Sequence, residues 1–168
     1  MKPLKLHMIN IGPYKDETVD FTKLENMFLI KGDTGAGKTF IFDAMTFALY
    51  GKLKGNRANC VQELRSKYAE DGSETFVEFV FEAAGKKYRV HRTVPYTLIN
   101  SKGRQVTKPS EVDFCRFADG EFISFGEKTE ATNERIQKII GLAADEFAQV
   151  VLLPQGAFAE FLKQSSKD

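Results

Sequence analysis

The pattern of apolar and polar positions predicts three antiparallel strand pairs along the chain. In each pair apolar residues alternate with polar ones, and a glycine-containing turn separates the two halves. Asp119-Gly120 is a strong turn signal, because two-residue hairpin turns need positive φ at their central residues. The predicted pairs lie at residues 4–21 around Gly12-Pro13, 77–90 around Ala84-Gly85, and 112–125 around Asp119-Gly120.

Continuous apolar runs mark segments that we expect to be buried on all sides. Met27 to Ile30 and Val150 to Leu153 are typical of strands covered on both faces of a sheet. Residues 40–50 are apolar nearly all round and stop at Gly51, which predicts a buried helix with a glycine cap. Further helices are predicted at 61–65, at 129–140 with Thr129 or Thr132 as cap and Gly141 as stop, and at 144–149.

Three glycines crowd the segment KGDTGAGKT, which separates the first apolar run from the buried helix. Gly32-x-x-x-x-Gly37-Lys38-Thr39 fits the phosphate-loop pattern, in the strand–loop–helix setting that the pattern requires. A helix N-terminus offers unpaired N–H groups to a phosphate, and glycines let the backbone wrap closely around it. Lys38 supplies a point charge, and the Thr39 hydroxyl can complete a Mg²⁺ shell. The segment therefore predicts binding of a nucleoside triphosphate rather than a turn with an incidental lysine.

Composition places the chain among soluble, single-domain proteins. Of its 168 residues 42% are hydrophobic and 28% charged, and the formal net charge of +1 favours no class of partner. Cys60 and Cys115 have no metal-ligand spacing and are too few for a disulfide scaffold, as expected of a reduced, cytoplasmic protein. No apolar run approaches membrane-spanning length, so we expect no membrane association.

The order of the elements predicts an α/β fold with mixed sheets, in which a phosphate loop is flanked by antiparallel hairpins. A doubly wound domain would alternate strands and helices throughout, and this chain does not. The guanine-reading Asn/Thr-Lys-x-Asp element of GTPases is missing, as is the arginine-rich lid of small nucleotide kinases. The pattern thus favours an ABC-type P-loop ATPase.

Several segments resemble the SbcC family, the bacterial members of the SMC-like DNA-repair ATPases. The resemblance runs over essentially the whole chain, and the LPQG-x-F element makes it specific, since phosphate loops alone occur in many NTPases. The segments are LKLHMINIGPYKDETVDF at 4–21, KGDTGAGKT at 31–39 followed by IFDAMTFALYG, ELRS at 63–66, and VVLLPQGAFAEFL at 150–162.

The resemblance implies a set of site residues. Lys38 and Gln155 would be catalytic, with Gln155 as the Q-loop glutamine that joins Thr39 on Mg²⁺ and helps to place the attacking water. From the sequence alone, a glutamine after Pro154 is more often a loop residue that bonds its own backbone. The implied nucleotide contacts are Gly32, Thr34, Gly35, Ala36, Gly37, Lys38, Thr39 and Phe40 at the phosphates, and Leu64 and Ser66 near the base and ribose.

The chain departs from the family pattern at two positions. Phe40 stands where the family usually has a second Thr or Ser, so a hydroxyl contact to the α-phosphate is lost while the backbone N–H remains. Gly12 takes the place of a nucleotide-contacting arginine of archaeal and eukaryotic relatives, so that contact is not expected here.

The resemblance also implies what residues 1–168 lack. We find no acidic residue at the end of an apolar strand to help hold Mg²⁺ or polarise water. In the family those residues lie in a C-terminal lobe, beyond a long coiled coil, and the ATP site is completed by a second subunit. We therefore expect the N-terminal lobe of a split ABC/SMC-type ATPase head that binds ATP and Mg²⁺ weakly or not at all by itself and hydrolyses none.

The function implied is that of the ATP-binding part of a complex that processes DNA double-strand breaks. The partners would be the chain's own C-terminal lobe, a second SbcC subunit, an SbcD-type nuclease and double-stranded DNA, with ATP gating DNA access to the nuclease. A chromosome-structuring SMC head, or another ABC-type ATPase without a nuclease partner, is the alternative.

One stretch of the chain is distinctly basic. Residues 83–110 contain no Asp or Glu, and Lys102, Arg104 and Lys108 within them are candidates for contacts to DNA phosphates. A solvated hairpin whose acidic partners lie on neighbouring segments after folding would have the same composition. The sequence leaves both interpretations open.

Overall fold

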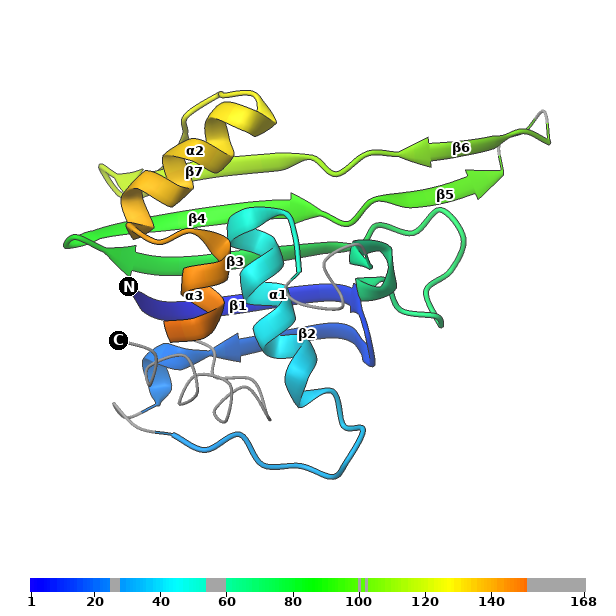
Figure 1. The fold of residues 1–168 in the computed structure, drawn as a ribbon, viewed down its shortest axis with the longest axis horizontal. Coiled ribbons are helices and arrows are strands. Elements are labelled where there is room, and N and C mark those ends of the chain that lie inside the picture. The colour runs from blue at the N-terminus through cyan, green and yellow to red at the C-terminus, as the bar shows by residue number, and fades with distance from the viewer. Residues whose placement is uncertain (25–27, 54–59, 100, 102, 151–168) are drawn as a thin grey trace, which may run out of the picture.

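The computed structural model describes residues 1–24, 28–53, 60–99, 101 and 103–150, and it is built on an antiparallel sheet. Six strands pair in the order β2-β1-β3-β4-β7-β8 (Figure 1). The three predicted strand pairs are confirmed, because each forms two adjacent strands of this sheet. The strands are β1 (Lys2–Ile11), β2 (Tyr14–Asp20), β3 (Phe76–Ala83), β4 (Lys86–Thr93), β7 (Val112–Ala118) and β8 (Glu121–Ser124).

Two of the predicted turns have the backbone that their residues suggest. Ala84 and Gly85 have φ of 48° and 70°, and Asp119 and Gly120 have φ of 53° and 92°. Positive φ at both central residues is what a type I′ hairpin turn requires, and this turn matches the twist of the strands that it joins. The turn chemistry therefore sets the register of the β3–β4 and β7–β8 pairs.

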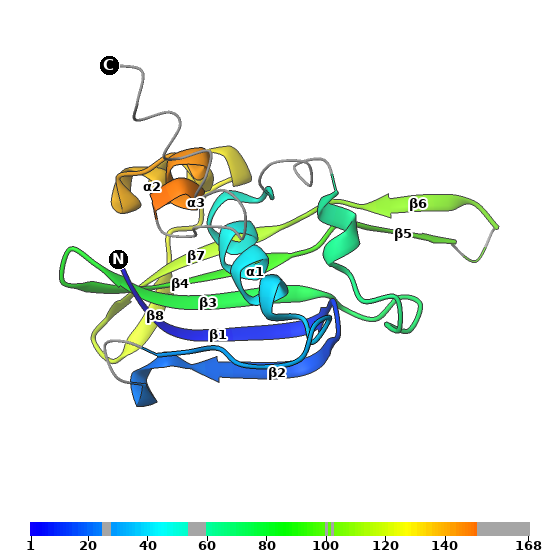
Figure 2. The same cartoon turned by 60° about the horizontal axis from the view of Figure 1, so that its bottom comes forward.

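The α-helices lie on one face of the sheet (Figure 2). They are α1 (Lys38–Tyr50), α2 (Thr129–Ile140) and α3 (Ala144–Val150), with short 3₁₀ helices η1 (Phe21–Lys23) and η3 (Val61–Leu64). As predicted, α1 and α2 end at Gly51 and Gly141, which have φ of 67° and 76°. No helix among the described residues is long and apolar enough to cross a membrane.

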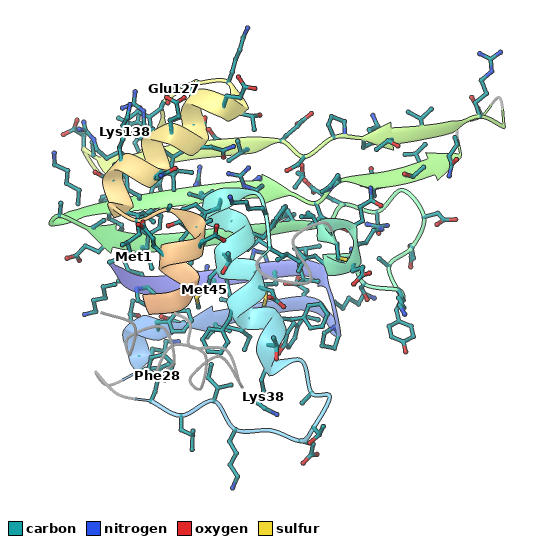
Figure 3. The ribbon with its side chains drawn as sticks, viewed as in Figure 1. Met1, Phe28, Lys38, Met45, Glu127 and Lys138 are labelled. Atoms are coloured by element: carbon teal, nitrogen blue, oxygen red, sulfur yellow. The ribbon has the colours of Figure 1, made fainter. Side chains whose placement is uncertain are left out.

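The core fills the space between this sheet face and the helices. Phe79, Phe81, Tyr88 and Phe114 of the inner strands form a chain of stacked rings with centroids 5.5 to 5.7 Å apart between neighbours. Alternate residues of a strand share a face, so β3 and β4 deliver these rings to the same side. The buried face of α1, which includes Met45, covers them (Figure 3).

The structure corrects the prediction of a buried strand at Met27–Ile30. Phe28 to Ile30 have no regular structure, and Leu29 is 85% exposed. A strand buried on both faces needs neighbouring strands, and no described strand pairs with this segment. Of the strand predicted at Val150–Leu153, Val150 is the last residue of α3, and the other three lie outside the described residues.

Two further details differ from the sequence-based expectation. Neither Thr129 nor Thr132 caps α2: the helix already begins at Thr129, after Lys128, and the Thr132 hydroxyl donates to the Glu127 carbonyl at 3.4 Å. The alternation of apolar and polar residues also did not predict a two-stranded ribbon. This ribbon consists of β5 (Tyr96–Ile99) and β6 (Gln105–Lys108), and it extends beyond the six-stranded sheet (Figure 1).

Candidate nucleotide-binding site

The glycine loop runs directly into the first turn of α1. Gly35 and Gly37 have φ of 87° and 88°, a region that side chains obstruct, so these two positions require glycine. Gly37 is the residue before the helix, and its carbonyl accepts the Phe40 N–H at 2.8 Å. The sequence therefore builds a loop whose backbone leads into the positive end of a helix dipole.

Lys38 lies at the end of α1 that adjoins this loop (Figure 3). Its Nζ donates to the carbonyls of Gly32 and Asp33, each at 2.7 Å, so the ammonium group bridges the two ends of the loop. Both carbonyls belong to exposed residues, and phosphate oxygens could replace them as acceptors of a charge-assisted hydrogen bond. The predicted phosphate-binding cation is thus placed at the loop.

The turn between β1 and β2 forms a wall beside the loop. A Cβ added to Gly37 would lie 2.4 Å from Pro13 Cγ and 3.2 Å from the Tyr14 hydroxyl. A Cβ added to Gly12 would lie 2.6 Å from Cδ1 of Phe40. Because each glycine lies directly against a side chain of the other segment, the phosphate loop and the Gly12-Pro13 turn pack closely into one corner. Phe40, the departure from the family pattern, packs its ring on Gly12.

The segment Leu64–Ser66 joins the same corner from the other side. The Gly12 N–H donates to the Leu64 carbonyl at 2.8 Å, and the Ser66 N–H donates to the Asn10 carbonyl at 2.7 Å. Leu64 is fully buried and Ser66 is 8% exposed, so this segment packs against the turn and presents little surface to a ligand. The structure thus brings the two sequence-predicted base and ribose positions next to the turn that contacts the phosphate loop.

Arg65, between those two positions, is a residue that sequence reasoning did not single out. Its guanidinium donates to the Ser73 carbonyl at 2.9 Å and to the Glu70 carbonyl at 2.8 Å, and it lies over the Tyr96 ring at 4.9 Å. A planar fork of donors suits several carbonyls at once. Arg65 therefore holds the loop that follows Ser66, and only the tertiary structure shows these partners.

The corner fits a triphosphate with Mg²⁺. Among the described residues Gly35 has no atom within 4 Å of an added Cβ, Lys38 supplies a cation, and Thr39 is exposed in the first turn of α1. A hydroxyl is a ligand that Mg²⁺ accepts beside phosphate oxygens and water. Gln155, the second predicted metal and catalytic residue, lies outside the described residues, and so does Lys102.

The basic stretch divides into two parts. On β4, the Arg89 Nε lies 3.8 Å from an oxygen of Glu78 on β3, and His91 is in register with Glu78 and with Asp113 on β7. Arg92 is only 1% exposed. Acids of neighbouring strands therefore lie beside Arg89 and His91, as the solvated-hairpin interpretation expects, whereas Arg92 is buried away from solvent.

The second part of the stretch lies on the ribbon formed by β5 and β6. Arg104 and Lys108 are exposed there, and the ribbon lies apart from the phosphate loop (Figures 1 and 2). The structure therefore does not bring the predicted DNA contacts and the predicted nucleotide contacts together. Two separate surfaces would serve the two ligands.

Comparison with known proteins relates this geometry to a family. A family model described as an AAA domain matches residues 5–168. The chain is 43% identical over 172 residues to a protein of Treponema pallidum (strain Nichols) named as the SbcC subunit of the nuclease SbcCD, and 38% identical over 170 residues to one of the same name from Staphylococcus aureus (strain MRSA252). Each match covers 100% of this chain and 16% of the relative, so the chain corresponds to a small part of these proteins.

A solved structure supports the fold assignment. It comes from work on the ATP-driven dimerisation and DNA-stimulated activation of SMC ATPases, and it matches with a TM-score of 0.61 over 97% of this chain and 92% of that chain. At 18% sequence identity the likeness concerns the fold alone. The fold is that of an SMC ATPase head, an ABC-type P-loop fold, as the sequence predicted.

Proposed function

Since the chain belongs to the AAA domain family, we propose that it is the ATP-binding N-terminal lobe of an SbcC-type ATPase head. The observation that carries the proposal is the corner in which two positive-φ glycines lead into α1 while Lys38 spans the loop. The names of the relatives favour an SbcC-type head over a chromosome-structuring SMC head. A cytoplasmic location remains part of the proposal.

In this proposal the chain's own residues bind and orient the phosphates. Lys38 exchanges the carbonyls of Gly32 and Asp33 for phosphate oxygens, which are stronger acceptors because they are charged. The Thr39 hydroxyl and Gln155 hold Mg²⁺, which when bound neutralises phosphate charge during hydrolysis. Leu64 and Ser66, which are buried beside the turn, are proposed to lie near the base and ribose. The close contact of Gly37 with Pro13 restrains the loop beside the phosphates.

Hydrolysis requires parts that residues 1–168 do not supply. We propose that the chain's own C-terminal lobe provides the acidic residues and that the site is closed by a second SbcC subunit. The exposed apolar side chains of Phe28 and Leu29 support this proposal, because they offer apolar surface to another part of the protein just before the loop. The 16% coverage of the relatives is consistent with a large remainder.

We propose that the wider function is the processing of DNA breaks together with an SbcD-type nuclease. In this proposal ATP controls the access of DNA to that nuclease. The relatives' name, which describes one part of a nuclease, supports the partner. The exposed Arg104 and Lys108 on the ribbon support contacts to duplex phosphates, together with Lys102. Such contacts would be sensitive to salt and blind to base sequence.

The experiment that tests nucleotide binding uses the chain mixed with a separately expressed C-terminal lobe. Binding of a fluorescent ATP analogue with Mg²⁺ is compared for wild type, Lys38→Ala and Lys31→Ala, an exposed lysine just before the loop that serves as control. We expect binding by wild type and Lys31→Ala and loss of binding in Lys38→Ala. Equal binding by all three proteins would refute the assignment of the loop.

A further inference from the structure

Arg92, in β4, is a buried cation that nucleotide binding does not use. It is 1% exposed, and its Nε donates to the Ala48 carbonyl at 2.9 Å. Its Nη2 donates to Oδ1 of Asn133 at 2.6 Å. Within the described part of the chain no carboxylate forms an ion pair with it. We call the contacts of Arg92 with Ala48 and Asn133 the Arg92 bridge.

A charge buried without a counter-charge is expensive, so its position calls for a physical reason. Burial lowers the pKa of Arg92 to about 10, which leaves the guanidinium charged at neutral pH. The Ala48 carbonyl belongs to the last turn of α1, where the helix dipole presents its negative end. Arg92 thus offsets part of its burial cost with a charge-assisted bond to that end of the helix.

Gly51 makes room for this arrangement. Its φ of 67° ends α1, and a Cβ at this position would lie 2.7 Å from Nη1 of Arg92. The guanidinium also lies 6.0 Å from the centroid of the Phe47 ring. The end of α1 therefore accommodates Arg92 in two ways: Gly51 leaves space for the guanidinium, and the Phe47 ring lies near it.

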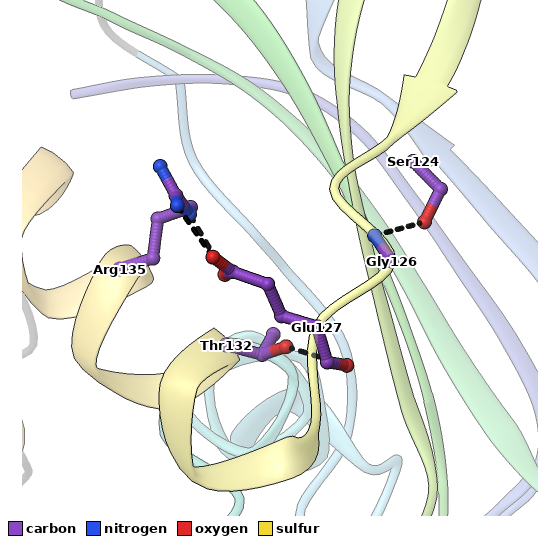
Figure 4. Close-up of polar contacts among 5 residues, drawn as sticks. All are labelled: Ser124, Gly126, Glu127, Thr132 and Arg135. Atoms are coloured by element: carbon purple, nitrogen blue, oxygen red, sulfur yellow. Dashed lines mark hydrogen bonds and ion pairs between the residues drawn. The ribbon is translucent and has the colours of Figure 1, made fainter.

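The Arg92 bridge connects three elements, namely β4, the C-terminal end of α1 and, through Asn133, the middle of α2. The start of α2 is held separately, by the pair that Arg135 forms with Glu127 and by the bond from Thr132 to the Glu127 carbonyl (Figure 4). The other end of α1 is the phosphate loop.

A second contact extends the connection to α3. The Tyr50 hydroxyl donates to the Leu142 carbonyl at 3.1 Å, and the Tyr50 ring lies 5.5 Å from that of Phe147 in α3. The last turn of α1 therefore contacts both α3 and the connection between α2 and α3. In the sequence, α3 directly precedes the segment that contains Gln155.

We propose that Arg92 is a positioning residue that holds α1 to α2, so that α1, α2 and α3 move as one unit when the phosphate loop takes up a nucleotide. The inference rests on the proposed nucleotide binding. In this inference, nucleotide binding at the loop shifts α1, and the Arg92 bridge passes that shift on to the helices at the other end of α1. Neither ligand contact nor proton transfer is required of Arg92.

The test removes the acceptor rather than the buried cation. Asn133→Leu replaces a half-buried amide by an apolar side chain of similar size, and Gln137→Leu is the matched control at an exposed residue one turn further along the same helix. Hydrogen–deuterium exchange of the nucleotide-free chain is followed in the last turn of α1 and in α2. In Asn133→Leu we expect exchange in α2 to rise about tenfold, since a hydrogen bond to a charged group is lost, and no rise in Gln137→Leu.

A second measurement follows the response to nucleotide binding. It separates an effect of the Arg92 bridge on that response from a general loss of stability. In the mixture with the C-terminal lobe, saturating ATP-γ-S·Mg²⁺ is expected to protect α2 of the wild type but not α2 of Asn133→Leu. Arg92→Lys keeps a cation for the Ala48 carbonyl but has no second nitrogen for Asn133. It should therefore retain protection in the last turn of α1 and lose it in α2.

Unchanged exchange and unchanged nucleotide-dependent protection in folded Asn133→Leu would overturn the inference. If the wild type bound no nucleotide, the proposed function would fail. The exchange rates of the nucleotide-free proteins would still decide whether the Arg92 bridge holds α1 to α2.

Discussion

The packing of the Phe40 ring on Gly12 gives a prediction that can be worked out from the structure. Gly12 has a φ of 51°, and a Cβ there would lie 2.6 to 2.7 Å from three atoms of the Phe40 ring. An L-residue in the left-handed region costs about 1–2 kcal/mol. Forcing an extra carbon into a packed site costs about 1–3 kcal/mol more. Gly12→Ala should therefore lower the free energy of unfolding by about 2–5 kcal/mol.

The steric part of this cost depends on the ring, and the backbone part does not. In a Phe40→Ala background the clash is absent, so Gly12→Ala should cost only the backbone strain of about 1–2 kcal/mol. The coupling energy of the double-mutant cycle is then about 1–3 kcal/mol. Gly85→Ala is the control, because Gly85 has a φ of 70° and no atom within 4 Å of an added Cβ.

Urea unfolding of the wild type, the two single variants, the double variant and Gly85→Ala measures these terms, provided that the slope with denaturant stays the same. We expect Gly12→Ala to cost more than Gly85→Ala when Phe40 is present and about the same when it is not. An equal cost of Gly12→Ala in both backgrounds would show that the ring does not pack on this turn, and the close packing of the turn against the phosphate-loop helix would be wrong.

Three further predictions concern the DNA surface, the response to acid and the core. Arg104→Ala and Lys108→Ala should each reduce the slope of log affinity for duplex DNA against log salt by about 0.9, measured by fluorescence anisotropy, and unchanged slopes would exclude these contacts. The hydrogen bond from Arg135 lowers the pKa of Glu127 below 4.5, so its stabilisation is present above pH 4.5 and is lost as the pH falls through the lowered value. Glu127→Gln should flatten this acid limb of the melting temperature against pH, whereas an identical limb in both proteins would argue against the pair. Phe79→Ala, at a fully buried ring, should cost about 3–5 kcal/mol in urea unfolding, and a cost below about 1 kcal/mol would contradict the aromatic core.

Local signals were sufficient for much of the fold. The hairpins at Ala84-Gly85 and Asp119-Gly120 could be predicted because the turn residues and the alternation on either side agree. The end of α1 at Gly51 and the loop at Gly32–Thr39 could be predicted because glycine marks backbone that other residues avoid. In each case the signal lies within a few residues of the structure that it specifies.

Other features depend on residues far apart in the sequence. Arg92 was counted in a basic stretch, yet its partners are Ala48 and Asn133, more than forty residues away on either side. Apolar composition at Phe28–Ile30 predicted a strand, but a strand also needs pairing partners, and no described strand provides them. Composition tells which residues prefer burial, whereas the choice of neighbour is made by the tertiary structure.

The central proposal is that residues 1–168 form one lobe of a split ATPase head and need the other lobe to bind ATP. Calorimetry of ATP-γ-S·Mg²⁺ binding to the chain alone, and to the chain mixed with its C-terminal lobe, tests this proposal most directly. We predict weak or no binding by the chain alone, a sharp gain in affinity with the second lobe, and no binding in either case for Lys38→Ala. Full binding together with ATP turnover by residues 1–168 alone would mean that the active site is complete within them, and the assignment as one lobe of a split ATPase head would be wrong.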